Sequence, residues 1–190
     1  GRILKILKEL KIEDNTIVMF SSDNGPHQEG RHKMEFFDSN GPLRGMKRDL
    51  YEGGIRVPFI ARWPGSVPAK KINHHISGFQ DMFPTLLELA QIELEHEVDG
   101  ISMVPTLLGK KGQRKHDYLY WEFGERGGAT AVLKGDWKGV RRNTRKNPNG
   151  PIEIYNLKND LAETTNLAEN QKALVAEFNA VLKREHVSQE

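Results

Sequence analysis

The N-terminal part of the chain changes from a helical pattern to a strand pattern within 20 residues. Four apolar residues recur at the spacing of one helix face: Ile3, Leu4, Leu7 and Leu10. Residues 16–20 then form an unbroken β-prone run, which is typical of a strand buried on both faces of a parallel sheet. A helix followed by a buried strand predicts an α/β domain.

The middle of the chain holds a long polar loop and two further core elements. Residues 21–54 are rich in Gly, Pro, Asn, His and charge, as functional loops usually are. Residues 57–61 predict a second core strand, closed by the turn Trp63-Pro64-Gly65. Asp81 is a candidate cap for a helix with Pro84 in its first turn. We expect this helix to cover the sheet with the apolar residues Met82, Phe83, Leu86, Leu87 and Ala90.

Beyond residue 112 the pattern changes to short strands joined as hairpins. Their predicted ranges are 118–123, 130–133, 137–141 and 152–155. A final helix over 169–184 is expected to bury Leu174, Phe178, Val181 and Leu182. We therefore predict two domains: residues 1–112 as part of an α/β domain, and residues 113–190 as a small antiparallel sheet with one packed helix.

The amino-acid composition excludes several classes of protein and of catalytic chemistry. The 190 residues include 37% hydrophobic and 28% charged residues, with no apolar run long enough to span a bilayer. The net charge of +2 does not by itself predict a nucleic-acid binder. The chain has no cysteine, which excludes disulfides, cysteine-ligated zinc and thiol catalysis.

The strongest local signal is Ser22-Asp23-Asn24-Gly25-Pro26-His27, directly after the first predicted strand. Ligands of open α/β sheets gather at the carboxyl ends of strands. Asp23 and Asn24 offer hard oxygen donors, which suit calcium or magnesium better than zinc. Because Asp-Asn-Gly is more often a plain turn, these residues alone leave both interpretations open.

A series of further motifs follows in a fixed order. The segments are Leu43-Arg44-Gly45-Met46-Lys47, Tyr51-Glu52-Gly53-Gly54-Ile55-Arg56-Val57-Pro58, Arg62-Trp63-Pro64-Gly65, Asp81-Met82-Phe83-Pro84-Thr85-Leu86-Leu87, Asp99-Gly100, Trp121-Glu122-Phe123, Ile154-Tyr155-Asn156-Leu157 and Glu163-Thr164-Thr165-Asn166-Leu167. In this order the chain resembles the sulfatase family over nearly its whole length.

The resemblance implies a fold and a set of roles. The expected fold is α/β, the C-terminal portion of an alkaline-phosphatase-like α/β sandwich followed by a small antiparallel β-sheet with a packed C-terminal helix. Asp23 and Asn24 would be calcium (Ca²⁺) ligands, and Lys47 would contact the sulfate group as a point charge. The intact enzyme would hydrolyse sulfate esters, and exported relatives suggest a periplasmic, extracellular or lysosomal location.

The family's nucleophile has no counterpart in this chain. Sulfatases use a formylglycine made from Cys or Ser in Cys/Ser-x-Pro-x-Arg, whereas the near match Ser66-Val67-Pro68-Ala69-Lys70 ends in Lys and lies on the wrong side of the metal pair. The first helix also lacks a polar cap residue, so we expect a longer protein that continues upstream. The chain alone should be inactive, because it carries only half of the site, and it should expose apolar surface that favours oligomers.

Other candidates are weaker. His27 is a possible proton donor or a loop-packing residue, and His74-His75 is interpreted as structural. Glu52 is expected to shape the turn that aims Lys47, with Arg56 paired internally. Basic residues could attract a sulfated glycan or be ordinary solvated charge: Lys110, Lys111, Arg114 and Lys115, and Arg141, Arg142, Arg145 and Lys146.

Two alternatives to a sulfatase remain at this stage. A phosphodiesterase or phosphonate hydrolase of the same superfamily would share these loops, although Asp-Asn in place of Asp-His favours one hard cation over a zinc pair. A non-catalytic module that binds sulfated polysaccharide would use the basic loops. The expected partners are a sulfate-ester substrate and the missing N-terminal half of the same protein.

Overall fold

The computed structural model describes residues 1–187 as two compact units. One unit combines residues 1–21 with 58–116, and the other combines residues 22–57 with the chain from 117 onward. Each unit is built from two separate stretches of sequence. The loop with Asp23 and Lys47 is thus grouped with the C-terminal strands, and the boundary near residue 112 stays a prediction.

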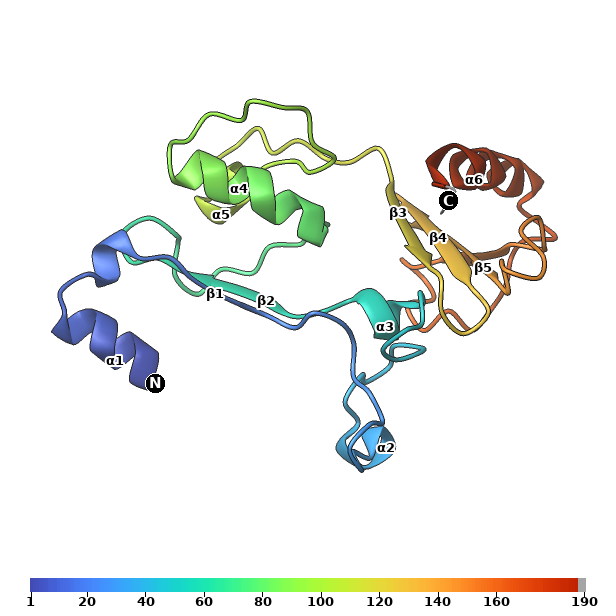
Figure 1. Cartoon of the computed structure of the whole chain (residues 1–190), viewed down its shortest axis with the longest axis horizontal. Helices are drawn as coiled ribbons and strands as arrows, with labels where there is room; N and C mark the ends of the chain where they lie inside the picture. The colour runs from blue at the N-terminus through green and yellow to red at the C-terminus, as the bar shows by residue number, and fades with distance from the viewer. Residues whose placement is uncertain (188–190) are drawn as a thin grey trace. The chain divides into compact units, whose positions relative to one another are not determined.

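The first unit is organised around a two-stranded ribbon. Helix α1 (Arg2–Glu9) and the 3-10 turn η1 (Glu13–Asn15) lead into β1 (Val18–Ser21), which pairs antiparallel with β2 (Phe59–Arg62) (Figure 1). The side chain of Trp63 donates to the carbonyl of Asp14 at 2.7 Å, and Arg62 lies 3.1 Å from Glu13. These contacts fix the turn before β1 to the end of β2.

Asp81 has a different role from the one predicted. The 3-10 turn η2 (Phe79–Asp81) precedes α4 (Met82–Leu89), and Asp81 makes no side-chain cap of α4. Its fully buried carboxylate instead accepts hydrogen bonds from the N–H groups of Gly78 and Ile101, at 2.9 and 2.7 Å, and contacts Nε2 of His116 at 2.7 Å. A capping residue usually has an extended backbone, whereas the backbone of Asp81 is helical. Its carboxylate is therefore directed to Gly78 and Ile101 and not to the first turn of α4.

Helix α4 is also less buried than its apolar pattern suggests. Pro84 and Thr85 are its buried residues, whereas Phe83 and Leu86 are exposed. Thr85 donates to the carbonyl of Asp81 and accepts from the N–H of Met103, one residue before α5 (Val104–Leu107). Polar contacts therefore hold α4 in this unit, and the predicted apolar face remains largely open among the described residues.

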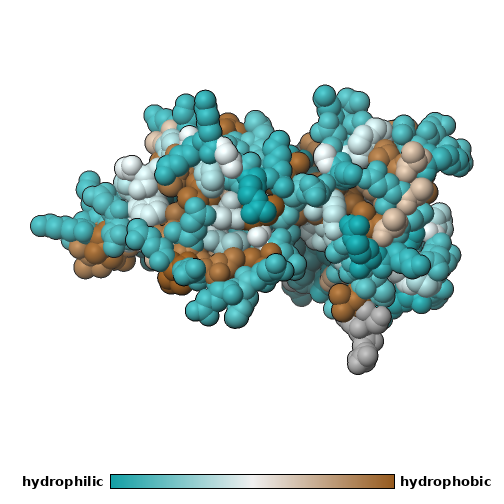
Figure 2. All heavy atoms as spheres, turned by 90° about the horizontal axis from the view of Figure 1, so that it is seen from above, coloured by the Kyte–Doolittle hydropathy of each residue, from teal (hydrophilic) through white to brown (hydrophobic). Residues whose placement is uncertain are grey.

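Exposed apolar side chains are concentrated in this first unit, as the brown surface in Figure 2 illustrates. They include Ile3, Ile6, Leu10, Phe20, Phe59, Ile60, Phe83 and Leu86. The prediction that the first strand is buried on both faces was wrong for these residues, since Phe20 is 62% exposed and β1 has an antiparallel neighbour. An apolar run indicates that a strand is normally buried, but it does not indicate whether the residues that bury it are among residues 1–187.

The second unit contains the antiparallel sheet that the hairpin pattern predicted. Its strand order is β3-β4-β5-β6, with bounds Leu119–Phe123, Ala129–Lys134, Trp137–Arg142 and Glu153–Asn156 (Figure 1). Helix α6 (Lys172–Glu185) packs on the sheet and buries Phe178, Val181 and Leu182. The predicted fold class is confirmed here: short hairpin strands with one packed C-terminal helix.

The two faces of this sheet have different partners. Val132 and Ile154 belong to a core formed with α6, where Gly139 leaves room for the ring of Phe178. The neighbouring residues Ala131, Val140 and Tyr155 pack instead with Leu50 and Tyr51. Since successive side chains of a strand point to opposite faces, the sheet is covered by α6 on one side and by the loop around Leu50 on the other.

Two short helices complete the loop region of this unit, α2 (Met34–Phe37) and α3 (Glu52–Ile55). None of the helices formed by residues 1–187 is long and apolar enough to cross a membrane.

Candidate functional site

Two segments that are separate in sequence meet in the second unit. The N–H of Gly25 donates to the carbonyl of Gly54 at 2.9 Å, and the N–H of Lys47 donates to the carbonyl of Pro26 at 2.8 Å. The structure therefore joins the segment after Asp23 and Asn24 to the segment that carries Lys47. Main-chain hydrogen bonds thus hold Asp23-Asn24 and Lys47, all predicted as site residues from the sequence, in one local framework.

Glycine is required where these segments touch. A Cβ on Gly25 would lie 1.8 Å from the carbonyl oxygen of Gly53, and a Cβ on Gly53 would lie 2.5 Å from that of Arg44. Both distances are far below van der Waals contact. The glycines of Asp-Asn-Gly and Glu-Gly-Gly thus serve close packing of main chain against main chain, which is more than the plain turn that the sequence alone allowed.

The loop around Lys47 is closed at its base. The N–H of Gly53 donates to the carbonyl of Arg44 at 2.7 Å, so residues 44 and 53 lie side by side. Inside the loop, Asp49 accepts from the N–H of Met46 at 2.9 Å and donates its own N–H to the Met46 carbonyl at 2.8 Å. Arg48 has a φ of +79°, a left-handed conformation that costs energy for a residue with a Cβ.

Glu29 is the partner of Lys47, and sequence reasoning missed it. The Lys47 ammonium lies 3.3 Å from Glu29 Oε2, and the guanidinium of Arg48 contacts the other carboxylate oxygen. Hydrogen bonds from Arg48 first and Lys47 second, with their charges, lower the pKa of Glu29 to about 2. Arg48 also lies 3.3 Å from Glu125, next to the sheet. No motif signals Glu29, because its role depends on how the loop folds back.

Asp23, Asn24 and His27 lie close to these groups along the chain. Asp23 is exposed and Asn24 is partly buried, while Ser22 donates to the Asn24 carbonyl at 2.8 Å. His27 is exposed, and its Nδ1 accepts the N–H of Glu29 at 3.0 Å, which leaves the proton of the neutral ring on Nε2. The His27 ring is 5.6 Å from that of His32.

The residues at hand fit part of a calcium site. Asp23 supplies a carboxylate and Asn24 an amide oxygen, the donor types that calcium prefers, but calcium takes six to eight oxygens. Among residues 1–187 no group of three or more His, Asp or Glu side chains could hold a metal by itself. Asp23 and Asn24 alone therefore supply only part of the oxygen ligands of such an ion.

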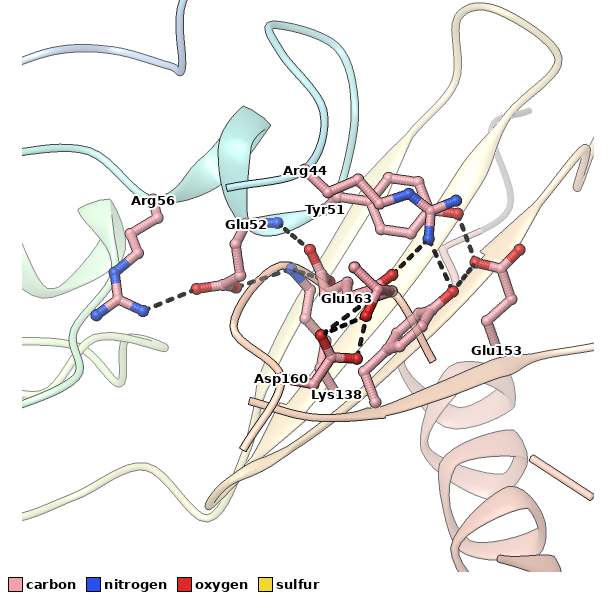
Figure 3. Close-up of polar contacts among 10 residues, drawn as sticks. Arg44, Tyr51, Glu52, Arg56, Lys138, Glu153, Asp160 and Glu163 are labelled. Carbon is pink, nitrogen blue, oxygen red and sulfur yellow. Dashed lines mark hydrogen bonds and ion pairs between the residues drawn. The ribbon is translucent and has the colours of Figure 1, made fainter. Parts of the chain in front are cut away.

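Beneath the loop lies a buried cluster of charges (Figure 3). Lys138 on β5 is fully buried, with its ammonium 2.8 Å from Glu52 Oε1 and 3.2 Å from Glu163 Oε1. Glu163 Oε2 accepts the N–H of Glu52 at 2.7 Å. Burial raises the pKa of Glu163, while Lys138 and the Glu52 N–H act in the opposite direction. Arg56 pairs with the outer oxygen of Glu52 at 3.2 Å, as predicted.

A second group of polar contacts holds Arg44 at the base of the loop. Its guanidinium donates to the hydroxyl of Tyr155 at 2.9 Å and to the carbonyl of Glu163 at 2.8 Å, and it lies 3.9 Å from the centre of the Tyr51 ring. The hydroxyls of Tyr51 and Tyr155 both donate to Glu153. Burial is the main cause that raises the pKa of both Tyr51 and Tyr155, and the hydrogen bond to Glu153 is the second. Both phenols therefore stay neutral and donate hydrogen bonds.

The other candidate residues contact groups outside the loop around Lys47. Arg141 is buried and donates to the carbonyls of Gly150 and Pro148, both at 2.9 Å, and to Asn179. Arg142 lies 3.3 Å from Glu153. Half of the second predicted basic cluster is therefore used within the fold. His75 lies in the first unit, where burial lowers the pKa of its ring, and the structural interpretation of His74-His75 stays a prediction.

Comparison with known proteins places this arrangement in context. Residues 1–92 match the family model named Sulfatase. The chain is 36% identical over 146 residues to N-acetylgalactosamine-6-sulfatase of Canis lupus familiaris, covering 73% of this chain and 26% of that protein. It is 40% identical over 125 residues to human steryl-sulfatase, covering 63% of this chain and 21% of that protein.

Solved structures show the same fold over almost the entire chain. The crystal structure of Ps i-CgsB superposes with a TM-score of 0.82 at 28% identity, covering 97% of this chain and 39% of that one. BT4656, solved in complex with its substrate D-glucosamine-2-N,6-O-disulfate, superposes with a TM-score of 0.75 at 25% identity, covering 97% and 38%. The chain thus spans about a quarter of its curated relatives and two fifths of these structures.

Proposed function

The chain belongs to the sulfatase family, and from this premise we propose that it is the C-terminal part of an enzyme that hydrolyses sulfate esters. The observation that carries the proposal is the pair of main-chain bonds that join Gly25 to Gly54 and Lys47 to Pro26. They bring the hard oxygen donors and the lysine of the family motif into one framework. The formylglycine nucleophile would lie upstream of this chain.

In this proposal Asp23 and Asn24 hold the calcium ion together with ligands from the upstream part. When bound, the cation withdraws charge from the sulfate oxygens. Lys47 binds the same sulfate group as a point charge and stabilises the negative charge that grows on the departing oxygen. An ammonium has three donors, so Lys47 can bind a sulfate oxygen while it keeps its contact with Glu29.

Glu29 and His27 would support this chemistry. With its pKa lowered to about 2, Glu29 stays ionised at neutral pH and holds both Lys47 and Arg48. The neutral ring of His27 carries its proton on Nε2, which suits it to donate a hydrogen bond to the leaving oxygen, and only the imidazolium form would transfer a proton to that oxygen. These roles require only that the substrate reaches the loop from its exposed side.

We further propose that the substrate is a sulfated saccharide. BT4656 was solved with a sulfated glucosamine, and i-CgsB with k-i-k-neocarrahexaose, each over a fold shared with 97% of this chain. A non-catalytic polysaccharide-binding module is less well supported, because Arg141 is buried and donates within the unit, and the exposed Arg142 lies 3.3 Å from Glu153.

The test uses the full-length protein and an aryl sulfate, with release of the phenol as the readout. Lys47→Ala should lower kcat/KM by roughly 10²- to 10³-fold, as expected for loss of a transition-state donor. Asp23→Ala with Asn24→Ala should abolish turnover and weaken calcium binding. Lys134→Ala is the matched control, since Lys134 is an exposed lysine of β4 paired with Glu177. Unchanged activity of the Lys47 variant, or faster turnover of an aryl phosphate, would contradict the proposal.

A further inference from the structure

Glu163 contacts both ends of the loop that carries Lys47. Its main-chain carbonyl accepts the Arg44 guanidinium at 2.8 Å, and its carboxylate accepts the N–H of Glu52 at 2.7 Å. Arg44 lies three residues before Lys47 and Glu52 five residues after it. One fully buried residue from the C-terminal chain therefore fixes the entry and the exit of this loop (Figure 3).

Lys138 offsets the negative charges of Glu52 and Glu163 beneath the loop. The cluster holds two buried carboxylates, Glu52 and Glu163, one buried cation, Lys138, and the exposed cation Arg56 at its edge, so its formal charges cancel. Removing one partner of such a cluster leaves an uncompensated buried charge. The Lys138 ammonium lies within 3.2 Å of both carboxylates and offsets the repulsion between them.

The sheet gives this cluster a rigid base. Lys138 and Val140 are two residues apart on β5, on the face that packs with Leu50 and Tyr51. On the opposite face, Gly139 packs against Phe178 of α6. A movement of the loop base would therefore disturb a sheet that is held from both sides.

We propose that Glu163 and Lys138 are positioning residues for Lys47, and that the C-terminal sheet contributes to sulfate binding through them without touching the substrate. This inference rests on the proposed function of Lys47. A lysine on a loop whose two ends are fixed is held near the geometry that a sulfate group requires, whereas a loop freed at one end lets the ammonium move. Misplacement of a binding group by about 1 Å is enough to reduce activity about 10²-fold.

The test measures the inhibition constant of inorganic sulfate and kcat/KM for an aryl sulfate in the full-length protein. Glu163→Gln keeps the acceptor for the Glu52 N–H but removes the charge that Lys138 balances. We expect it to raise the sulfate inhibition constant and lower kcat/KM, each by about 10- to 100-fold. Glu177→Gln is the control, because Glu177 lies on the exposed side of α6 and pairs with Lys134. It should change neither constant.

A double-mutant cycle separates positioning from plain stability. If Glu163 acts through Lys47, Glu163→Gln should have little further effect on sulfate inhibition once Lys47→Ala is present. A purely structural role predicts instead a lower thermal midpoint with an unchanged sulfate inhibition constant in protein that remains folded at low temperature. Full additivity of the two changes, or an unchanged constant in Glu163→Gln alone, would overturn the inference.

The same constants also separate this inference from the proposed function. If Lys47→Ala leaves sulfate inhibition unchanged, the function proposed for Lys47 fails. If Lys47→Ala weakens inhibition but Glu163→Gln does not, only the positioning inference fails.

Should Glu163→Gln not fold, Arg44→Lys applies the same test at the other end of the loop, because it loses contacts to Tyr155 and to the Glu163 carbonyl. Wild-type inhibition by sulfate in that variant would equally reject positioning.

Discussion

Lys47 donates its main-chain N–H to the carbonyl of Pro26 at 2.8 Å, so the lysine of one motif is bonded directly to the segment that follows Asp23 and Asn24. The two segments are more than 20 residues apart in sequence. Their contact converts separate sequence motifs into a single framework. It also makes the geometry of the framework sensitive to single substitutions in the main-chain contacts beside it.

Gly25→Ala should be strongly destabilising. Its new methyl group would lie 1.8 Å from the carbonyl oxygen of Gly53, and main chain cannot move aside as a flexible side chain can. We expect a loss of about 3 kcal/mol or more in the free energy of unfolding, measured from urea denaturation of the full-length protein. Gly124→Ala is the control, because only the end of the Arg145 side chain comes within 4 Å of its Cβ. Equal midpoints for the two variants would refute the close packing.

Replacing Lys138 should separate a broken ion cluster from a neutral one. Lys138→Met leaves Glu163 buried without a cation and Glu52 with only the exposed Arg56, and should cost about 3 to 5 kcal/mol in the free energy of unfolding. Adding Glu52→Gln and Glu163→Gln to this variant removes the uncompensated charges, so most of that loss should be recovered. Urea denaturation measures both. A triple variant less stable than Lys138→Met would show that the charges are not the cause.

The contact of Glu29 with Arg48 and Lys47 should persist from neutral pH down to about pH 5. The folded pKa of about 2 lies below the usual value of 4.5, so the ionised carboxylate favours the folded state. This contribution is fully present above pH 4.5 and is lost as the pH falls toward 2. The difference in urea midpoint between wild type and Glu29→Gln should therefore be constant from pH 8 to pH 5 and then shrink. A difference that disappears near pH 6 would contradict the assigned pairing.

Arg141 should matter for stability and not for attraction of a polyanion. Arg141→Met removes donors from the carbonyls of Gly150 and Pro148 and from Asn179, and should cost about 2 to 3 kcal/mol in the free energy of unfolding. Retention of the folded protein on an immobilised sulfated polysaccharide should not change. Arg145→Ala, at an exposed position of the same cluster, should leave the unfolding free energy unchanged. Weaker retention of the Arg141 variant would favour the binding module.

Local sequence patterns were sufficient for the C-terminal unit. The short β-prone runs, such as the one around Ala131 and Val132, and the helical spacing of Phe178, Val181 and Leu182 mark the buried elements, so the four strands and α6 were predicted close to their bounds. The apolar runs near Phe20 and Phe83 were less informative, because a pattern states that a face needs cover but not where that cover comes from.

The polar part of the site was predictable only where a motif marks it. Lys47 and the Asp23-Asn24 pair belong to motifs, whereas Glu29, Lys138 and the exact use of Glu163 depend on contacts between residues up to 119 positions apart. A lysine in an alternating strand predicts a solvated side chain. Only the meeting of β5 with the loop shows that Lys138 is instead buried between two carboxylates.

The most direct measurement is a crystal structure of the full-length protein with calcium and inorganic sulfate. We expect side-chain oxygens of Asp23 and Asn24 at about 2.3 to 2.6 Å from the cation. We also expect the Lys47 ammonium within about 3 Å of a sulfate oxygen. A cation bound without Asp23 and Asn24, together with Lys47 in contact with Glu29 alone, would contradict the function proposed for these residues.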